Sequence, residues 1–174
     1  MGKNLKTLKL ENCDDITDFS FLSVMSQLEE LYAQSEGIRD IGFVEGMADL
    51  KKLTISHTNV LNLDGLSGRD SLTSLVVERC YELKNCSSIG GLTNLEELSL
   101  DVPYGCEVPD LSGLVNLKDL TLGGFEQTSF IRNFGALETL SMEGCGIDDP
   151  GAFKSLVNLK ELKCSRVYGD TAGW

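Results

Sequence analysis

The leucines of this chain recur with a nearly constant period. The pattern Leu-x-x-Leu-x-Leu occurs in eight copies, which are separated by 23, 22, 22, 23, 22, 20 and 22 residues. The copies begin at Leu5, Leu28, Leu50, Leu72, Leu95, Leu117, Leu137 and Leu159, with Ala, Ile, Val, Met or Cys replacing the last leucine in five of them. The alternation of apolar and polar residues predicts one short strand in each copy, because successive strand side chains point to opposite faces. The chain is therefore an array of one repeated unit.

A second apolar series follows each predicted strand at a spacing of three residues. In the first copy it consists of Ile16, Phe19, Leu22 and Met25. This spacing places side chains on one side of a 3₁₀ or extended turn. A single unit of about 22 residues cannot bury both apolar series, but stacked units share one continuous core. The pattern predicts an α/β solenoid of eight repeats, with a concave parallel sheet and short 3₁₀ or irregular turns on the convex side.

These repeats resemble the leucine-rich repeat family from Leu5 to about Val167. The ninth position, where the family carries Asn or Cys, holds Cys13, Thr58, Cys80 and Cys145 in four copies. The repeat length is similar to the short class of internalins and the phosphatase-1 regulatory subunit. The cysteines are similar to those of kinetoplastid and plant resistance proteins. The resemblance implies a concave sheet that binds a protein partner.

We expect one domain over residues 1–174, because the chain has only three prolines and no Pro-, Gly- or Ser-rich linker. We expect no complete capping units, which in solenoids cover the two ends of the core with a polar outer face. A repeat already begins at Leu5, and the chain stops soon after the eighth predicted strand. Val167, Tyr168 and Trp174 are expected to fold back as a partial lid. These observations favour either a fragment of a longer protein or end-to-end association through the edge strands. The sixth repeat, two residues shorter than most, is expected to be the least regular.

The six cysteines indicate free thiols. Those at Cys13, Cys80 and Cys145 lie three repeats apart, about 14 Å, which is too far for a disulfide. The others, Cys86, Cys106 and Cys164, fall at predicted inward positions, where a free Cys behaves as a small apolar residue. Reduced thiols, together with the lack of a signal-peptide core, favour an intracellular, cytoplasmic location. No apolar run is long enough to cross a bilayer, so no membrane partner is expected.

Asp or Asn recurs two residues after the start of the return leg in six repeats, in a shifted version in the fifth. The positions are Asp18, Asp40, Asn62, Asn85, Asp110 and Asp149. These side chains accept hydrogen bonds from nearby amides, so we expect each to start a convex turn. A calcium ladder is the alternative, but one carboxylate per repeat offers few oxygens for a hard cation. We therefore expect no metal.

The residue after each first leucine forms a column of mostly alternating charge. It reads Lys6, Glu29, Lys51, Thr73, Glu96, Lys118, Glu138 and Lys160. Opposite charges on neighbouring parallel strands reduce repulsion, and each exposed pair contributes at most about 1 kcal/mol. The column is interpreted as a device that sets strand register, and a binding site is the alternative.

The exposed strand positions supply the candidate binding residues. The predicted anchors are Tyr32, His57, Val76, Arg79 and Val102, and Tyr104 extends the patch along a loop. Tyr and Arg are enriched among residues that dominate binding energy. For each aromatic residue the alternative is a rim side chain packed on its own repeat.

Charge and chemistry exclude several function classes. The exposed strand positions carry nine Lys or Arg against eleven Asp or Glu, so most of the net charge of -12 lies elsewhere. Clustered basic residues are lacking, which disfavours nucleic acid. The single histidine and the lack of phosphate-binding motifs argue against an enzyme or a cofactor. We expect a non-catalytic protein-binding module. The alternatives are a self-assembling scaffold, or the recognition arm of a ubiquitin ligase or GTPase regulator.

Overall fold

Eight parallel strands form one sheet in sequence order. The computed structural model describes residues 4–169. The strands are β1 (Thr7–Glu11), β2 (Glu30–Gln34), β3 (Lys52–Ser56), β4 (Ser74–Glu78), β5 (Glu97–Asp101), β6 (Asp119–Gly123), β7 (Thr139–Glu143) and β9 (Glu161–Ser165). The register places equivalent leucines opposite one another, as in Leu31, Leu53 and Leu75 of β2, β3 and β4. The predicted repeat and its strands are confirmed.

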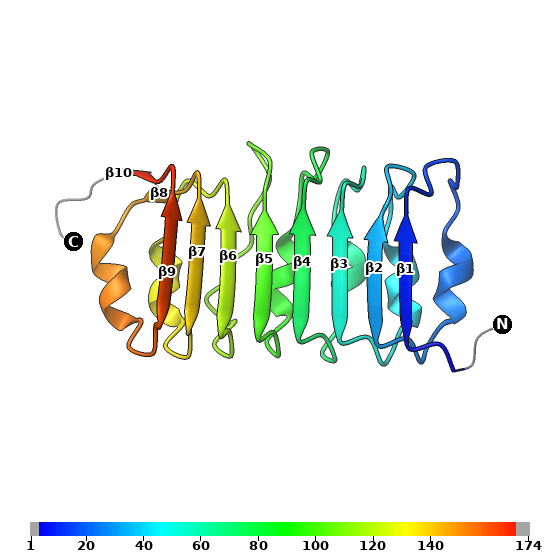
Figure 1. Ribbon diagram of the computed structural model, residues 1–174, viewed down its shortest axis with the longest axis horizontal. Coiled ribbons are helices and arrows are strands. Elements are labelled where there is room, and N and C mark those ends of the chain that lie inside the picture. Colours follow the sequence, from blue (N-terminus) through cyan, green and yellow to red (C-terminus); the bar gives the residue numbers. More distant parts are fainter. Residues whose placement is uncertain (1–3, 170–174) are drawn as a thin grey trace.

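Short 3₁₀ helices form the second layer. They are η1 (Ser20–Val24), η2 (Gly42–Gly46), η3 (Asp64–Leu66), η4 (Ser87–Gly91), η5 (Ser129–Asn133) and η6 (Pro150–Ser155). Figure 1 shows them behind the sheet and spread more widely than the strands, which places the sheet on the concave side. Within residues 4–169 the fifth repeat has no such helix, whereas the sixth contains η5. The prediction that the sixth repeat itself is the least regular is therefore wrong.

The core runs along the whole array between the two layers. Leucines such as Leu53 on the strands and Leu66 on the return legs are fully buried, and Phe134 is the largest of the fully buried side chains. Burying each such side chain contributes about 1.5–3 kcal/mol. At the sheet edges the same positions are less covered, because each repeat is buried by its neighbours. Leu8 is half-buried, and Leu162 of β9 is 39% exposed.

The expected lid at the C-terminal edge is only partly present. Val167 packs against the core, as expected. Tyr168 belongs instead to β10 (Tyr168–Gly169), which pairs with β8 (Gly146–Ile147), and its side chain is 53% exposed. Trp174 lies outside the described residues. The prediction that Tyr168 covers the edge is wrong, because pairing with β8 holds it beside the seventh repeat.

The recurring Asp and Asn residues start the convex turns, as predicted. Each side-chain oxygen accepts a hydrogen bond from the backbone N–H two residues later, over 2.7 Å at Asp40 and 3.1 Å at Asn62. The same bond is made by Asp18, Asn85, Asp110 and Asp149. These bonds satisfy amides that the turn would otherwise leave without a partner.

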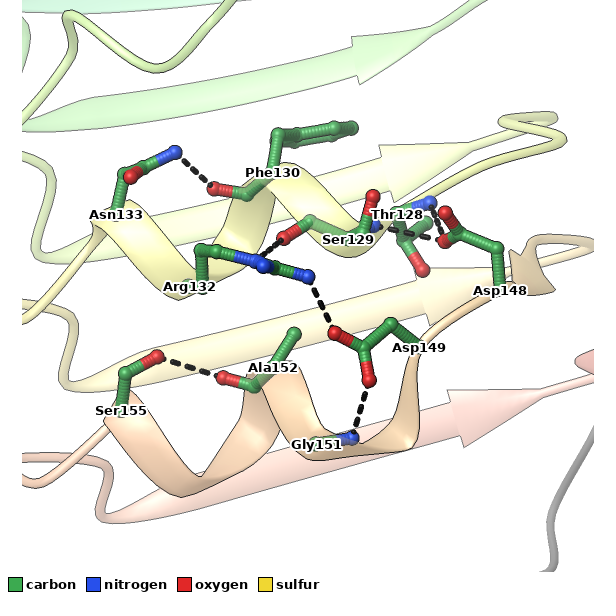
Figure 2. A network of polar contacts seen from close by, with 10 residues as sticks. All are labelled: Thr128, Ser129, Phe130, Arg132, Asn133, Asp148, Asp149, Gly151, Ala152 and Ser155. Carbon is green, nitrogen blue, oxygen red and sulfur yellow. Dashed lines mark hydrogen bonds and ion pairs between the residues drawn. The ribbon is translucent and has the colours of Figure 1, made fainter.

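The sixth repeat has Gln127 at this position, and the next repeat supplies the missing acceptor. Asp148 Oδ1 accepts hydrogen bonds from the amides of Thr128 and Ser129, over 2.7 and 2.8 Å (Figure 2). The adjacent Asp149 accepts a bond from Gly151 in its own repeat and forms an ion pair with Arg132. Burial alone would raise the pKa of Asp148, but the hydrogen bonds from Ser129 and Thr128 outweigh it and lower the pKa. Two consecutive carboxylates thus start the turns of two repeats.

The charged column also forms as predicted. Glu29 lies between Lys6 and Lys51, with N–O distances of 2.8 Å to each. Glu96 and Glu138 pair with the lysines of the following strands, Lys118 and Lys160. The hydrogen bonds from Lys51 and then Lys6 lower the pKa of Glu29 to about 2. Because these side chains are exposed, the column favours the register without contributing much to stability.

Replacing Asp148 with Ala is expected to reduce the free energy of unfolding by about 1–2 kcal/mol, the usual effect of losing a helix-capping side chain. Asp148→Asn retains one oxygen acceptor, so it should lose less. Urea denaturation followed by circular dichroism measures both values. Asp15→Ala is the matched control, because Asp15 is exposed and makes no hydrogen bond within the described residues. Equal stability of Asp148→Ala and Asp15→Ala would contradict a capping role for Asp148.

Candidate functional site

The concave face is a trough with a floor of small side chains. Its middle row, in strand order, contains Lys9, Tyr32, Thr54, Val76, Ser99, Thr121, Ser141 and Lys163. The five central members are small, whereas the longer side chains stand at the two ends. Lys9 Nζ lies 5.9 Å from the centre of the Tyr32 ring, whose hydroxyl donates to Gln34 Oε1 over 2.6 Å. The neighbours of Tyr32 therefore hold it at one end of the trough.

Most strands end in a residue with left-handed backbone. The positive φ angles belong to Asn12, His57, Arg79, Gly124, Gly144 and Arg166, which occupy the same position in six repeats. This conformation bends the chain so that the next residue turns into the core, as Cys80 does after Arg79. It costs a residue other than Gly about 1–2 kcal/mol. The side chains of His57 and Arg79 consequently remain at the surface.

His57 and Arg79 form one polar chain across β3 and β4. An Arg79 guanidinium nitrogen lies 3.1 Å from His57 Nε2, and His57 Nδ1 lies 2.9 Å from Ser56 Oγ. Because arginine only donates, Nε2 is the acceptor and the proton sits on Nδ1. The Ser56 hydroxyl then donates to Glu78 over 3.3 Å. The two predicted anchors are thus held together as a unit.

Val102 does not lie where the sequence predicted. Its side chain is only 6% exposed and packs into the core, so the prediction of an accessible anchor is wrong. The residue is β-branched and precedes Pro103, and both properties disfavour the left-handed conformation that keeps Arg79 outside. Val102 indeed lacks a positive φ, and the chain turns inward one residue early.

The remaining predicted anchors lie on two different surfaces. Val76 is half-buried at the centre of the trough, in register with Thr54, the neighbour of Tyr32. The structure thus places Tyr32, His57, Val76 and Arg79 on adjacent strands of the concave face. Tyr104 is 96% exposed on the loop after β5, away from the sheet.

Sequence reasoning missed an acidic group beside these anchors. The carboxylates of Glu78, Asp101 and Glu143 line one depression together with Gly123. A Cβ at Gly123 would lie 2.5 Å from Asp101 Oδ1, so the carboxylate occupies the space that a side chain would fill. Burial, followed by the charges of Glu143 and Glu78, raises the pKa of Asp101. Gly123, which has no side chain in an exposed strand position, was the sequence signal that could have indicated this group.

The cysteines do not assemble a reactive centre. All six are free, and burial raises the pKa of Cys80, Cys86 and Cys145. Cys164 is exposed, against expectation, because β9 is an edge strand. In adjacent repeats the Cys86 and Cys106 sulfurs lie 3.9 Å apart. Over residues 4–169, no group of three or more His, Cys, Asp or Glu is arranged to hold a metal ion.

No helix in the described part of the chain has the length and apolar character that a membrane span requires.

Asp101→Asn is expected to stabilise the protein slightly at pH 7, because it removes a charge whose pKa is raised by burial and by the neighbouring Glu143 and Glu78. Solvent screening keeps the gain small, since the residue is exposed. The folded pKa lies above the ordinary value of 3.8, so the folded state binds the proton more tightly than the unfolded state. The native aspartate therefore costs stability as the pH rises through the raised pKa. Thermal unfolding between pH 3 and 7 should show the advantage of the variant vanishing at low pH. Asp119→Asn is the control on β6, and an Asp101 variant no more stable than it would contradict the raised pKa.

Two known proteins have sequences similar to this chain. No protein-family model matches the sequence. A protein of Trypanosoma equiperdum named as an adenylate cyclase regulatory protein is 30% identical over 171 residues, covering 92% of this chain and 26% of that protein. The Arabidopsis thaliana disease resistance protein RRS1 is 27% identical over 177 residues, covering 94% of this chain and 12% of its own length. This chain thus spans about a quarter or less of these two relatives.

Solved structures agree on the fold. Internalin C2 of Listeria monocytogenes superposes with a TM-score of 0.84 and 23% identity, over 96% of this chain and 74% of its own. That structure shares the solenoid of parallel strands and short convex turns. The repeats, their register and these likenesses agree: the chain has the leucine-rich repeat fold, an internalin-like solenoid.

Proposed function

We propose that this chain is a non-catalytic module that binds a partner protein on its concave face. Leucine-rich repeat folds generally bind proteins and are typically non-catalytic. The observation that carries the proposal is the open trough, in which small side chains from Thr54 to Ser141 form the floor. Tyr32 bounds it at one end.

The anchors favour a protein as the ligand. Tyr32 and the His57–Arg79 pair offer rigid amphipathic surface, of the kind that dominates protein interfaces. Val76 supplies an apolar contact at the centre. The side chains of Tyr32, His57 and Arg79 are already ordered by hydrogen bonds, so binding through them loses little side-chain entropy.

Val76→Arg is expected to abolish partner capture, because a long charged side chain would fill the centre of the trough. The immobilised variant, the wild type and Val24→Arg are compared for proteins retained from a cell lysate. Val24 lies on η1 and is 76% exposed, so it offers the same substitution on the convex layer. A partner should be retained by the wild type and Val24→Arg, and lost by Val76→Arg. Equal retention by all three would refute binding at the trough.

The sheet edges favour a second candidate, end-to-end self-association. Leu162 and Cys164 of β9 are exposed at positions that are buried in the central strands. Lateral strand pairing with another copy would cover them. A mass that rises with concentration in sedimentation, and falls in Leu162→Lys, distinguishes this candidate from a monomeric module.

The cellular context also belongs to the proposal. Six free thiols support an intracellular, cytoplasmic location. The relatives are much longer than this chain, so a role as the recognition arm of a ubiquitin ligase or GTPase regulator would depend on sequence outside it.

A further inference from the structure

The boundary between the fifth and sixth repeats lacks a contact that the other central repeats make. After each strand, a backbone amide normally bonds to a carbonyl of the preceding repeat. Examples are Lys84 to Leu61, over 2.9 Å, Glu107 to Lys84, over 2.8 Å, and Gly146 to Phe125, over 2.7 Å. Among the described residues no such bond joins the sixth repeat to the fifth. At this boundary the chain of the fifth repeat turns inward early, at the buried Val102, and the sixth repeat is two residues shorter than most.

A groove of about 710 Å³ lies at this boundary. This size falls within the range of about 300–1,000 Å³ that is typical of ligand sites. The floor contains Phe125, which is 3% exposed and packs on Phe130 with ring centres 5.8 Å apart. Val108 and Pro109 also line it, and Tyr104 stands fully exposed at the rim. The groove therefore has a mixed lining, in which an apolar and aromatic part built by Phe125, Val108 and Pro109 lies beside polar side chains such as Gln127 and Ser129.

The charge around the groove has one sign. Asp110 and Glu126 line it, whereas no Lys, Arg or His does. Glu107 is exposed beside Val108, and the whole chain carries a net charge of -12. Such a field attracts cations and disfavours acidic ligands.

Some backbone amides at the groove also lack backbone partners. The amides of Glu126 and Gln127 make no backbone hydrogen bond in the described structure. Pro103 and Pro109 on the opposite wall have no N–H with which to pair. An extended peptide could complete this interrupted ladder, as in strand addition to an open edge.

We propose that the groove between the fifth and sixth repeats binds an extended segment of a partner protein. The segment inserts a bulky apolar side chain between the loops of Val108 and Phe125. It presents a lysine or arginine to Glu126 and Asp110. This site is separate from the trough, since its walls are loops beyond the carboxyl ends of β5 and β6.

The probe is a displayed library of random twelve-residue peptides, selected on the folded wild-type chain. Enriched peptides are synthesised with a fluorescent label, and their affinities are measured by anisotropy. We expect each to contain a Phe, Trp, Leu or Met close to a Lys or Arg. Raising the salt concentration should weaken binding, because the charged contacts are exposed.

Three variants test the position of the site. Val108→Lys and Tyr104→Ala should each weaken binding about tenfold, as loss of an interface anchor does. Glu126→Gln should weaken it less and reduce its dependence on salt. Val115→Lys, the same change at an exposed valine outside the groove, should bind as the wild type does. These positions are exposed, and thermal unfolding confirms that each variant folds.

The opposite results overturn the proposal. They are a selection that enriches no peptide, enriched peptides without a basic residue, or undiminished binding to Val108→Lys. Val76→Arg separates this site from the trough, because filling the trough should leave peptide affinity unchanged. Peptides lost only by Val76→Arg would assign binding to the trough and refute the groove, whereas failure of the trough proposal would leave the groove result intact.

Discussion

Lateral stacking of equivalent repeats is the constraint on which this structure depends. No unit can bury its strand leucines and its return leg alone, so each uses the neighbouring units as the rest of its core. This requirement fixes the parallel register, since a shift of one residue would turn Leu53 outward and Thr54 inward. It also explains why side chains that are fully buried in central strands are exposed on β9. The concave trough follows from the same register, which aligns its small residues in one row.

Departures from the repeat have different consequences according to whether a neighbour compensates. Gln127 cannot start its turn as the aspartates do, but Asp148 reaches back from the next repeat and restores both hydrogen bonds. Among the described residues the ladder between the fifth and sixth repeats has no such substitute, and a groove of mixed polar and apolar lining lies there. The sixth repeat thus receives its missing hydrogen bonds from the seventh repeat on one side, and it forms the candidate binding groove with the fifth repeat on the other.

The sequence predicted the features that recur in every repeat. The predictions failed at single residues that differ from the equivalent residues of the other repeats. Period and alternation were sufficient for the strands, the core, the turn-starting acids and the charged column, because each is set by local spacing. Val102 was misplaced because its conformation depends on a β-branched side chain followed by proline, which column alignment ignores. The acidic group around Gly123 was missed because it joins β4, β5 and β7, and its members are not close in sequence. The groove lies where the fifth repeat has no 3₁₀ helix among the described residues, and the interval between leucines showed neither that change nor the shape of the groove.

The interrupted ladder also bears on how cooperatively the array unfolds. In a repeat protein, stability is approximately a sum of internal terms and couplings between nearest neighbours. The coupling across the fifth and sixth repeats still includes the main sheet, but it lacks the second ladder that neighbouring boundaries have. It is thus the natural place for the array to divide into two cooperative blocks, one on each side. A segment bound across this boundary would act as a clamp and make the two blocks unfold as one.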